Sequence, residues 1–342
     1  DGTVENPGGG RRQDAWRFRF QSGQQCVLHR CRHSRKSGQS DRGMDRENGH
    51  QSHQQRHARC GYAALESGQE HDAICGRSHP TAQAGRRVMS KFIREELLVD
   101  GVKTVVQSAG TGEPLVLFHG AGTVDGFDFA EAWASRFRVI VPYHPGFGES
   151  GDDPSFTDIH DYVMHYLELF DILKIDTLSL IGLSMGGYLA ARFASEHGHR
   201  VKKLVLIAPY GLDVPEYPAL DIIATPGEQL VPMLVSNFDA LKPHLPEKPD
   251  MEFIAARYRE ATTFARLFWE HPIDPKFPRY LHRVKMPTLI VWGDEDKIIP
   301  VEHAQAWRKW IPNAEVMIVK GAGHIVHRDK PEVADAIGKF LG

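Results

Sequence analysis

A serine flanked by glycines stands at residues 182–186, which read GLSMG. Glycines two positions before and two positions after Ser184 permit a tight turn that presents the hydroxyl of the serine. The short apolar stretch before it, residues 178–183, predicts a buried strand, and residues 186–197 predict a helix. This strand–turn–helix context favours a nucleophilic serine over an ordinary serine in a glycine-rich turn.

A serine hydroxyl needs a base to take its proton, and histidine has a suitable pKa. The chain has 19 histidines, so position has to decide among them. His324 follows the sequence GAG on a loop between an expected strand, residues 314–319, and the last expected helix. His327 lacks such a glycine turn, and we expect it to be a surface histidine. His119 precedes a glycine-rich loop, and we expect it to hydrogen-bond that loop rather than act as the base.

Three carboxylates follow the expected strand at residues 288–292: Asp294, Glu295 and Asp296. A carboxylate at this place could hold the base histidine in one tautomer and stabilise its cation. Spacing alone leaves the choice among the three open. Asp213, which follows another expected strand, is a less favoured alternative.

Residues 118–122, which read FHGAG, follow an expected strand at residues 115–118. Acyl transfer places negative charge on the former carbonyl oxygen, and backbone N–H groups aimed at that oxygen stabilise it. The glycines of this loop would let its backbone approach the serine. The N–H of Met185, at the start of the helix behind the serine, is a second candidate donor.

These candidates lie where strands and helices alternate along the chain. Asp100 and Gly101 separate two expected strands and give a strong hairpin signal. The alternation predicts an α/β fold, with a mostly parallel central sheet, helices on both faces and reactive groups beyond the carboxyl ends of the strands. Strands are expected at residues 92–99, 102–107, 115–118, 139–141, 178–183, 203–208, 288–292 and 314–319, and helices at 159–173, 186–197, 302–310 and 333–341.

One segment, residues 211–283, interrupts this alternation and is too long for an ordinary connection. It carries several prolines and two expected amphipathic helices, at residues 228–238 and 251–269. We expect this insert (residues 211–283) to form a helical lid that supplies the acyl or alcohol pocket. Its large apolar residues could line that pocket, although at helical spacing such residues usually pack onto the core: Met233, Leu234, Phe238, Phe253, Tyr258, Phe264, Phe268 and Trp269.

From residue 92 onward the chain resembles the α/β-hydrolase family of serine hydrolases. The order of serine, acid and histidine along the chain is the order of that family. The other matching motifs are FHG at residues 118–120, PGFGES at 145–150, WG at 292–293 with Asp296, and GH at 323–324 with Pro331. The chain departs from the family at His144, where many relatives have aspartate, and we expect the loop that follows it to be structural.

The resemblance implies a role for each candidate. Ser184 would be the nucleophile, His324 the general base, and Asp296 the acid that orients the histidine. The N–H groups of Ala121 and Met185 would form the oxyanion hole. The choice of Asp296 and of Ala121 comes from the resemblance, since spacing leaves both open.

A serine nucleophile indicates hydrolysis of carboxylic esters through an acyl-enzyme, without a metal or an organic cofactor. The moderate size of the insert favours short or medium acyl chains. Carbon–carbon bond hydrolases of ring-cleavage diketones are an alternative, but they usually carry tryptophan directly after the base histidine, where this chain has Ile325. A lactonase is a further alternative. A non-catalytic binding protein is less favoured, because it would normally lack one of the three catalytic residues.

The composition changes sharply near residue 88. Residues 1–88 hold 15 basic and nine acidic side chains and all four cysteines, whereas the remainder holds 26 basic and 35 acidic side chains. We expect residues 1–88 to be disordered or a non-native leader, because they contain few large apolar residues. A zinc module is less favoured, since Cys26 and Cys31 have no second close cysteine pair. Met89 is typical of a natural start, and residues 89–342 would then form the hydrolase domain.

No stretch approaches the roughly 18 consecutive apolar residues that span a bilayer, and the first ten residues lack a basic segment followed by an apolar run. The formal net charge is −3, and the arginines of residues 1–88 are diluted among polar residues. We therefore expect a cytoplasmic protein that acts on a small-molecule ester and binds neither nucleic acid nor membranes. The sequence leaves the oligomeric state open.

Overall fold

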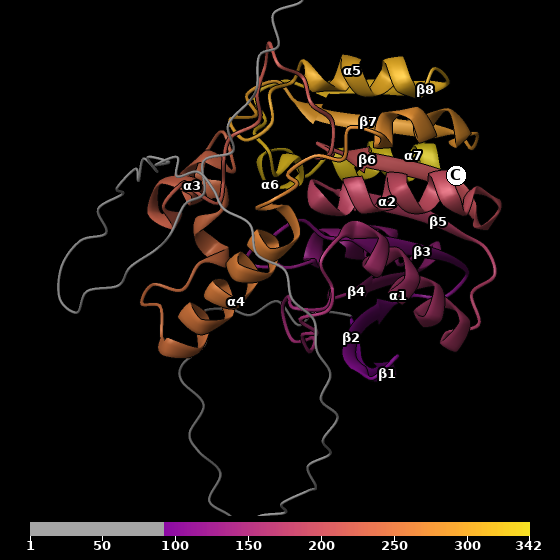
Figure 1. Ribbon diagram of the computed structural model, residues 1–342, viewed down its shortest axis with the longest axis horizontal. Coiled ribbons are helices and arrows are strands. Elements are labelled where there is room, and N and C mark those ends of the chain that lie inside the picture. Colours follow the sequence, from indigo (N-terminus) through magenta and orange to yellow (C-terminus); the bar gives the residue numbers. More distant parts are fainter. Residues whose placement is uncertain (1–91) are drawn as a thin grey trace, which may run out of the picture. The chain divides into compact units, whose positions relative to one another are not determined.

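A computed structural model describes residues 92–342, shown as ribbons in Figure 1. The expectations for residues 1–88, and for a start at Met89, lie outside the described residues. None of the helices within residues 92–342 is both long and apolar enough to cross a membrane.

Eight strands form one sheet in the order β1-β2-β4-β3-β5-β6-β7-β8. The pairs β1–β2 and β2–β4 are antiparallel and all other pairs are parallel, so the predicted mostly parallel sheet is confirmed. The strands are β1 (Ile93–Val99), β2 (Val102–Ala109), β3 (Glu113–Phe118), β4 (Phe137–Pro142), β5 (Leu178–Leu183), β6 (Val201–Ile207), β7 (Thr288–Gly293) and β8 (Ala314–Val319).

The predicted hairpin joins β1 to β2 through a two-residue turn. Asp100 has a φ of 45° and Gly101 a φ of 80°. A turn with two positive φ angles matches the twist of the strands that it joins, and aspartate followed by glycine is a preferred pair for it.

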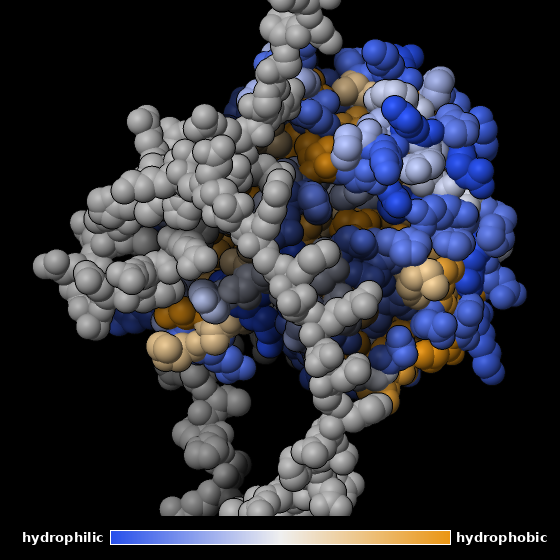
Figure 2. Space-filling view, in the orientation of Figure 1, coloured by the Kyte–Doolittle hydropathy of each residue, from blue (hydrophilic) through white to orange (hydrophobic). Residues whose placement is uncertain are grey.

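Helices cover both faces of the sheet, as predicted. One face carries α1 (Ile159–Ile172), α2 (Met185–Glu196) and α5 (His303–Trp310), and the other carries α6 (Val326–Asp329), α7 (Val333–Leu341) and a 3-10 helix (Asp128–Trp133). Each central strand is buried on both sides, since alternate side chains enter different clusters. In β5, Leu180 belongs to the core under α1 and α2, whereas Ile181 belongs to the core under α7. Hydrophilic residues cover most of the visible outer surface on the right of Figure 2.

The insert follows β6 and contains α3 (Gly227–Met233) and α4 (Met251–Phe268), which Figure 1 shows beyond one end of the sheet. The helix predicted over residues 251–269 is confirmed. The helix predicted over residues 228–238 was wrong in its second half, because α3 ends at Met233. Pro232 lies in its last turn and has no N–H for the helical ladder. The chain then turns inward, and Val235 packs in a small buried cluster with Ile325.

Candidate active site

Ser184 occupies the turn between β5 and α2 with φ 54° and ψ −116°. A non-glycine residue rarely adopts a positive φ, and it does so only where the surrounding structure enforces it. Here the N–H of Ser184 donates to the carbonyl oxygen of Ile207 at 2.9 Å. The carbonyl oxygen of Ser184 accepts from the amides of Gly187, Tyr188 and Tyr210 at 2.9–3.1 Å. The backbone of the serine is therefore fixed by α2, by β6 and by the residue that leads into the insert.

The two glycines of the GLSMG motif are required by close packing. A Cβ at Gly182 would lie 2.3 Å from the carbonyl oxygen of Gly186. A Cβ at Gly186 would lie 2.3 Å from the carbonyl oxygens of Phe118 and His119. Any side chain at either position would thus collide with backbone atoms, which is why this tight turn needs glycine at both.

His324 and Asp296 form a hydrogen-bonded pair. His324 Nδ1 lies 2.8 Å from Asp296 Oδ2, and both side chains are buried. The other oxygen, Oδ1, accepts from the amides of Ile298 and Ile299 at 2.8 and 2.9 Å. Because an ionised carboxylate only accepts, Nδ1 of the histidine carries the proton and Nε2 keeps its lone pair. The loops after β7 and β8 bring these two predicted residues together.

The other two carboxylates that follow β7, Asp294 and Glu295, are not part of this hydrogen-bonded pair. Asp294 and Glu295 are exposed, and Asp294 accepts from the amide of Gly321 at 2.7 Å; in the part of the chain that the structure describes, neither carboxylate hydrogen-bonds His324. No hydrogen bond joins Ser184 Oγ to His324 within residues 92–342. Hydrogen bonds between a nucleophile and its base are often long until substrate binds.

The two amides predicted for the oxyanion hole are close to the serine. The N–H groups of Ala121 and Met185 donate to no other group within the described part of the chain. A Cβ at Gly120 would lie 3.4 Å from the Cβ of Ser184, which places this loop directly beside the serine. Met185 begins α2, whose free N–H groups and positive dipole end favour negative charge.

His119 hydrogen-bonds the loop, as expected. Its Nδ1–H donates to the carbonyl oxygen of Gly120 at 2.7 Å, and its Nε2 accepts the amide of His144 at 3.0 Å. Burial lowers the pKa of His119 to about 4, so the ring stays neutral at pH 7. In return, Nε2–H of His144 donates to the carbonyl oxygen of His119 at 2.9 Å, while its Nδ1 accepts the hydroxyl of Tyr166. Burial also lowers the pKa of His144 well below its usual value.

His327 is buried, so the expectation of a surface histidine was wrong. Its Nε2 lies 3.0 Å from Asp125 Oδ2, and its ring stacks on Phe129 with 3.7 Å between centroids. Arg328 lies against the same aspartate and also pairs with Asp128. The short helix α6 turns His327 toward the 3-10 helix of residues 128–133, and no local sequence pattern marks this tertiary pairing.

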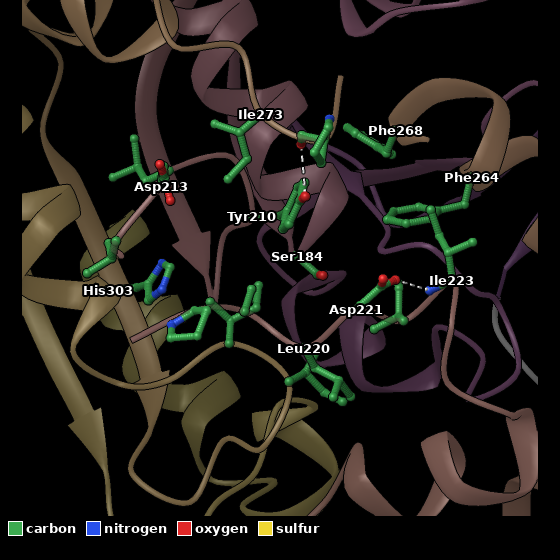
Figure 3. Close-up of a pocket in the computed structure, with 18 of the residues that line it drawn as sticks. Ser184, Tyr210, Asp213, Leu220, Asp221, Ile223, Phe264, Phe268, Ile273 and His303 are labelled. Atoms are coloured by element: carbon green, nitrogen blue, oxygen red, sulfur yellow. Dashed lines mark hydrogen bonds between the residues drawn. The ribbon is translucent and has the colours of Figure 1, made fainter. Parts of the chain in front are cut away.

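A cavity of about 440 Å³ opens beside Ser184. In Figure 3 the serine lies centrally, with Asp213 and His303 on one side and Asp221 and Phe264 on the other. Of the apolar insert residues named above, Phe264, Phe268 and Trp269 line it, whereas the other five do not. The remaining lining residues are Tyr210, Leu212, Val214, Pro218, Ala219, Leu220, Ile222, Ile223, Pro272, Ile273, Ile298 and Ile299.

The polar groups of the cavity are few and uneven in charge. Asp213 and Asp221 line it, whereas no lysine or arginine is among the residues that do. The hydroxyl of Tyr210 donates to the carbonyl oxygen of Pro272 at 2.8 Å, and burial raises its pKa to about 12. Nε2–H of His303 donates to the carbonyl oxygen of Tyr217, and burial lowers its pKa. The cavity is therefore apolar, with a negative edge.

Comparison with known proteins places this geometry in a family. Residues 115–336 match the sequence profile of the alpha/beta hydrolase family. The chain is 29% identical to 2-hydroxymuconate semialdehyde hydrolase of Pseudomonas putida, over 69% of this chain and 89% of that protein. It is also 29% identical to Lipase 1 of Psychrobacter immobilis, over 68% of this chain and 78% of that protein.

A solved structure extends the likeness to the backbone. A serine hydrolase involved in carbazole degradation superposes with a TM-score of 0.59 at 28% identity, covering 73% of this chain and 98% of that one. The residues matched by the family profile, 115–336, include the turn that carries Ser184 and the loop that carries His324. Because the profile matches more than half of the chain, and the relatives and the fold are of the same kind, the chain belongs to the alpha/beta hydrolase family.

Proposed function

We propose that the chain is a carboxylic-ester hydrolase that works through an acyl-enzyme on Ser184. In this proposal His324 is the general base and Asp296 orients it. The N–H groups of Ala121 and Met185 form the oxyanion hole, and the insert acts as a lid that shapes the acyl or alcohol pocket.

The bond between His324 and Asp296 carries the proposal. It holds the imidazole in the tautomer whose Nε2 lone pair can take a proton. Two backbone amides satisfy the second carboxylate oxygen, so the aspartate cannot turn away without losing both. A base held in one tautomer, on a loop at the same sheet edge as a strained serine, suits acyl transfer better than a structural role.

The reaction then has two halves. Ser184 Oγ attacks the ester carbonyl carbon while its proton moves to His324 Nε2, and the oxyanion accepts hydrogen bonds from the two amides. Collapse of this intermediate expels the alcohol, which takes the proton from Nε2. Water then attacks the acyl-enzyme, with His324 again removing a proton, and the acid is released as Ser184 regains its own.

The charge of the cavity favours a neutral substrate. Several relatives are named for acting on dienoates, such as 2-hydroxy-6-oxo-2,4-heptadienoate hydrolase. A dienoate is a carboxylate anion, and it would meet Asp213 and Asp221 with no lysine or arginine among the cavity's lining residues. Like charges oppose such binding. A neutral ester with short or medium apolar groups meets no such opposition and matches the apolar walls.

Carbon–carbon bond hydrolysis is a second candidate. The similarity to 2-hydroxymuconate semialdehyde hydrolase and to the carbazole-degradation enzyme favours it. Both reactions use a serine and a histidine at one sheet edge, so the catalytic groups do not separate them, and the cavity charge is the observation that does.

The test is a panel of p-nitrophenyl esters with two to ten acyl carbons, run beside a ring-cleavage dienoate. We expect turnover of the shorter esters and little turnover of the dienoate, measured as kcat/KM. Ser184→Ala should lower ester turnover by ~10⁴–10⁶, because the serine acts within a triad. Ser179→Ala, on the strand that leads to Ser184, is the matched control and should leave turnover nearly unchanged.

Faster dienoate than ester turnover would select the carbon–carbon reaction. Ester turnover that survives Ser184→Ala would reject the mechanism altogether.

A further inference from the structure

A buried carboxylate on the insert faces the loop of the proposed oxyanion hole. Glu260 lies on α4 and is only 2% exposed, although glutamate is almost never fully buried unless it is paired. No step of the proposed mechanism uses it. Its surroundings on the core side are the loop that carries Ala121 and the loop of residues 144–151.

Glu260 joins three parts of the molecule. Its Oε1 accepts from Thr123 Oγ1 at 2.6 Å, on the loop that carries Ala121. The same oxygen accepts from the amide of Gly148 at 3.0 Å. Arg257, one turn earlier on α4, donates to Oε1 at 3.0 Å and lies 2.8 Å from Oε2. Arg257 also donates to Thr123 Oγ1 at 3.1 Å.

These contacts are strong hydrogen bonds that fix the relative positions of their partners. A hydrogen bond from a hydroxyl to an ionised carboxylate is shorter than a bond between neutral groups and about twice as strong. Charge–dipole bonds in a buried site are weakened little by solvent. A Cβ at Gly122 would lie 3.8 Å from Glu260 Oε2, so the carboxylate packs along the loop as well as bonding it.

We propose that Glu260 is a positioning residue, which holds the oxyanion loop through Thr123 when the insert is seated. This inference rests on the proposed function. Thr123 follows Ala121 by two residues, so a bond that fixes Thr123 restrains the same short loop that carries the Ala121 N–H. The insert would then set not only the pocket but also the alignment of an oxyanion donor.

The main alternative is that Glu260 only anchors α4. In that case its loss would loosen the insert, raise KM and lower thermal stability, with kcat little changed. A positioning role predicts the opposite pattern, because the oxyanion bond strengthens in the transition state and an interaction made there affects kcat.

The experiment starts with Glu260→Gln, which keeps size and one acceptor oxygen but removes the charge. We expect kcat for a p-nitrophenyl ester to fall ~10–50-fold with KM within about twofold, less than the loss of a whole oxyanion donor. The rate at which a fluorophosphonate labels Ser184, followed by intact mass, should fall by a similar factor. Glu252→Gln, an exposed glutamate on the same helix, is the control and should change neither quantity.

Thr123 provides a second, independent arm. Thr123→Val removes the hydroxyl and should lower kcat by a factor similar to that of Glu260→Gln, whereas Thr123→Ser keeps the donor and should restore most of the rate. The double variant, with Glu260→Gln and Thr123→Val, should lose little more than Thr123→Val alone, because glutamine weakens the same bond that valine removes. These threonine variants test the inference even if the Glu260 variant does not fold.

The outcomes separate the two proposals. If Ser184→Ala abolishes turnover but Thr123→Val and Glu260→Gln keep kcat and labelling rates of the wild type, the positioning role is wrong and the esterase stands. If KM rises while kcat is kept, Glu260 is an anchor and the inference is overturned. If wild type hydrolyses no ester, the esterase proposal fails, and the labelling rates still decide the role of Glu260.

Discussion

At the scale of single residues, the two oxygens of Asp296 have different partners. Oδ1 accepts from two backbone amides and Oδ2 faces Nδ1 of His324. The two backbone amides require an oxygen at the Oδ1 position, because only an oxygen can accept their hydrogen bonds. The other side-chain atom is therefore the one that faces His324. The identity of the atom at the Oδ2 position therefore fixes the tautomer of His324.

Asp296→Asn tests this arrangement. The amides of Ile298 and Ile299 keep the side-chain oxygen, so the asparagine NH₂ turns toward His324 Nδ1 and donates to it. The histidine then carries its proton on Nε2 and cannot accept that of Ser184. We expect kcat to fall by ~10³–10⁴ at an unchanged fold, measured by steady-state kinetics and circular dichroism.

Asp294→Asn is the control, two residues away, where an amide oxygen can still accept from Gly321. It should leave kcat nearly unchanged. Equal losses in the two variants would mean that Asp296 acts on the loop as a whole and not on the tautomer.

Two of the candidate catalytic residues can be predicted from local sequence, because each lies in a glycine-rich turn. Ser184 and His324 stand beside glycines that the close packing requires, so their spacing from these glycines is enough to select them. The pairing of Asp296 with His324 required the family resemblance. Glu260 was not predicted to matter, and His327 was wrongly expected at the surface. Each is buried against a partner more than 130 positions away in the sequence, Thr123 for Glu260 and Asp125 for His327.

At the scale of elements, strands were the most predictable part of the fold. The strands at residues 178–183 and 314–319 have the predicted limits. The first is buried along its whole length, as a largely apolar run in a central strand indicates. The second lies at the edge of the sheet and is only partly buried. The helix α3 was predicted too long, because the apolar pattern continued past Pro232 into residues that pack on Ile325. Hydrophobic spacing reports burial, and burial does not require a helix.

The packing of α1 on β2 also makes stability depend on pH. His165 of α1 is buried, its Nε2 lies 3.1 Å from Thr104 Oγ1, and burial lowers its pKa to about 4. In the unfolded chain the pKa of His165 is near 6.5, so between about pH 6.5 and pH 4 the unfolded state binds a proton at this side chain and the folded state does not. Stability from this group is therefore complete above about pH 6.5 and is lost as the pH falls toward 4.

His165→Gln should flatten this dependence. By pH 5 the wild-type group has lost about 2 kcal/mol of stability relative to pH 7, which corresponds to a fall in Tm of roughly 4–8 °C. Between pH 7 and pH 5, the Tm of the variant should therefore fall less than that of the wild type by roughly 4–8 °C, measured by thermal unfolding followed by circular dichroism. His160→Gln, an exposed histidine on the same helix, is the control. If the two variants keep the same slope, the proton uptake belongs to other groups, such as His119 and His144.

At the scale of the whole molecule, the excess of negative charge in residues 89–342 is expected to disfavour anionic substrates. Residues 89–342 carry 35 acidic and 26 basic side chains, and two of the carboxylates, Asp213 and Asp221, line the cavity. A field of this sign slows the approach of anionic substrates and does not affect neutral ones. Selectivity by charge would then come from the edge of the cavity and from the surface together.

Replacing Asp213 and Asp221 by asparagine tests this. Asparagine at 221 can still accept from the amides of Ile223 and Ala224. We expect kcat/KM for a half-ester of a dicarboxylic acid to rise ~3–10-fold relative to its neutral diester, with a smaller ratio at high salt. Glu247→Gln, an exposed insert residue outside the cavity lining, should leave the ratio unchanged. A ratio that does not move in the double variant would reject selectivity by these carboxylates.

The carbonyl oxygen of Ser184 accepts the amide of Tyr210, the residue just before the insert. Only main-chain atoms take part in this bond, so any amino acid except proline at that junction can make it. This contact with the reactive turn is thus independent of the side chain at residue 210. An insert exchanged between relatives at this junction would keep the bond to Ser184, and it would keep the oxyanion loop aligned only if it carried a carboxylate equivalent to Glu260 opposite Thr123.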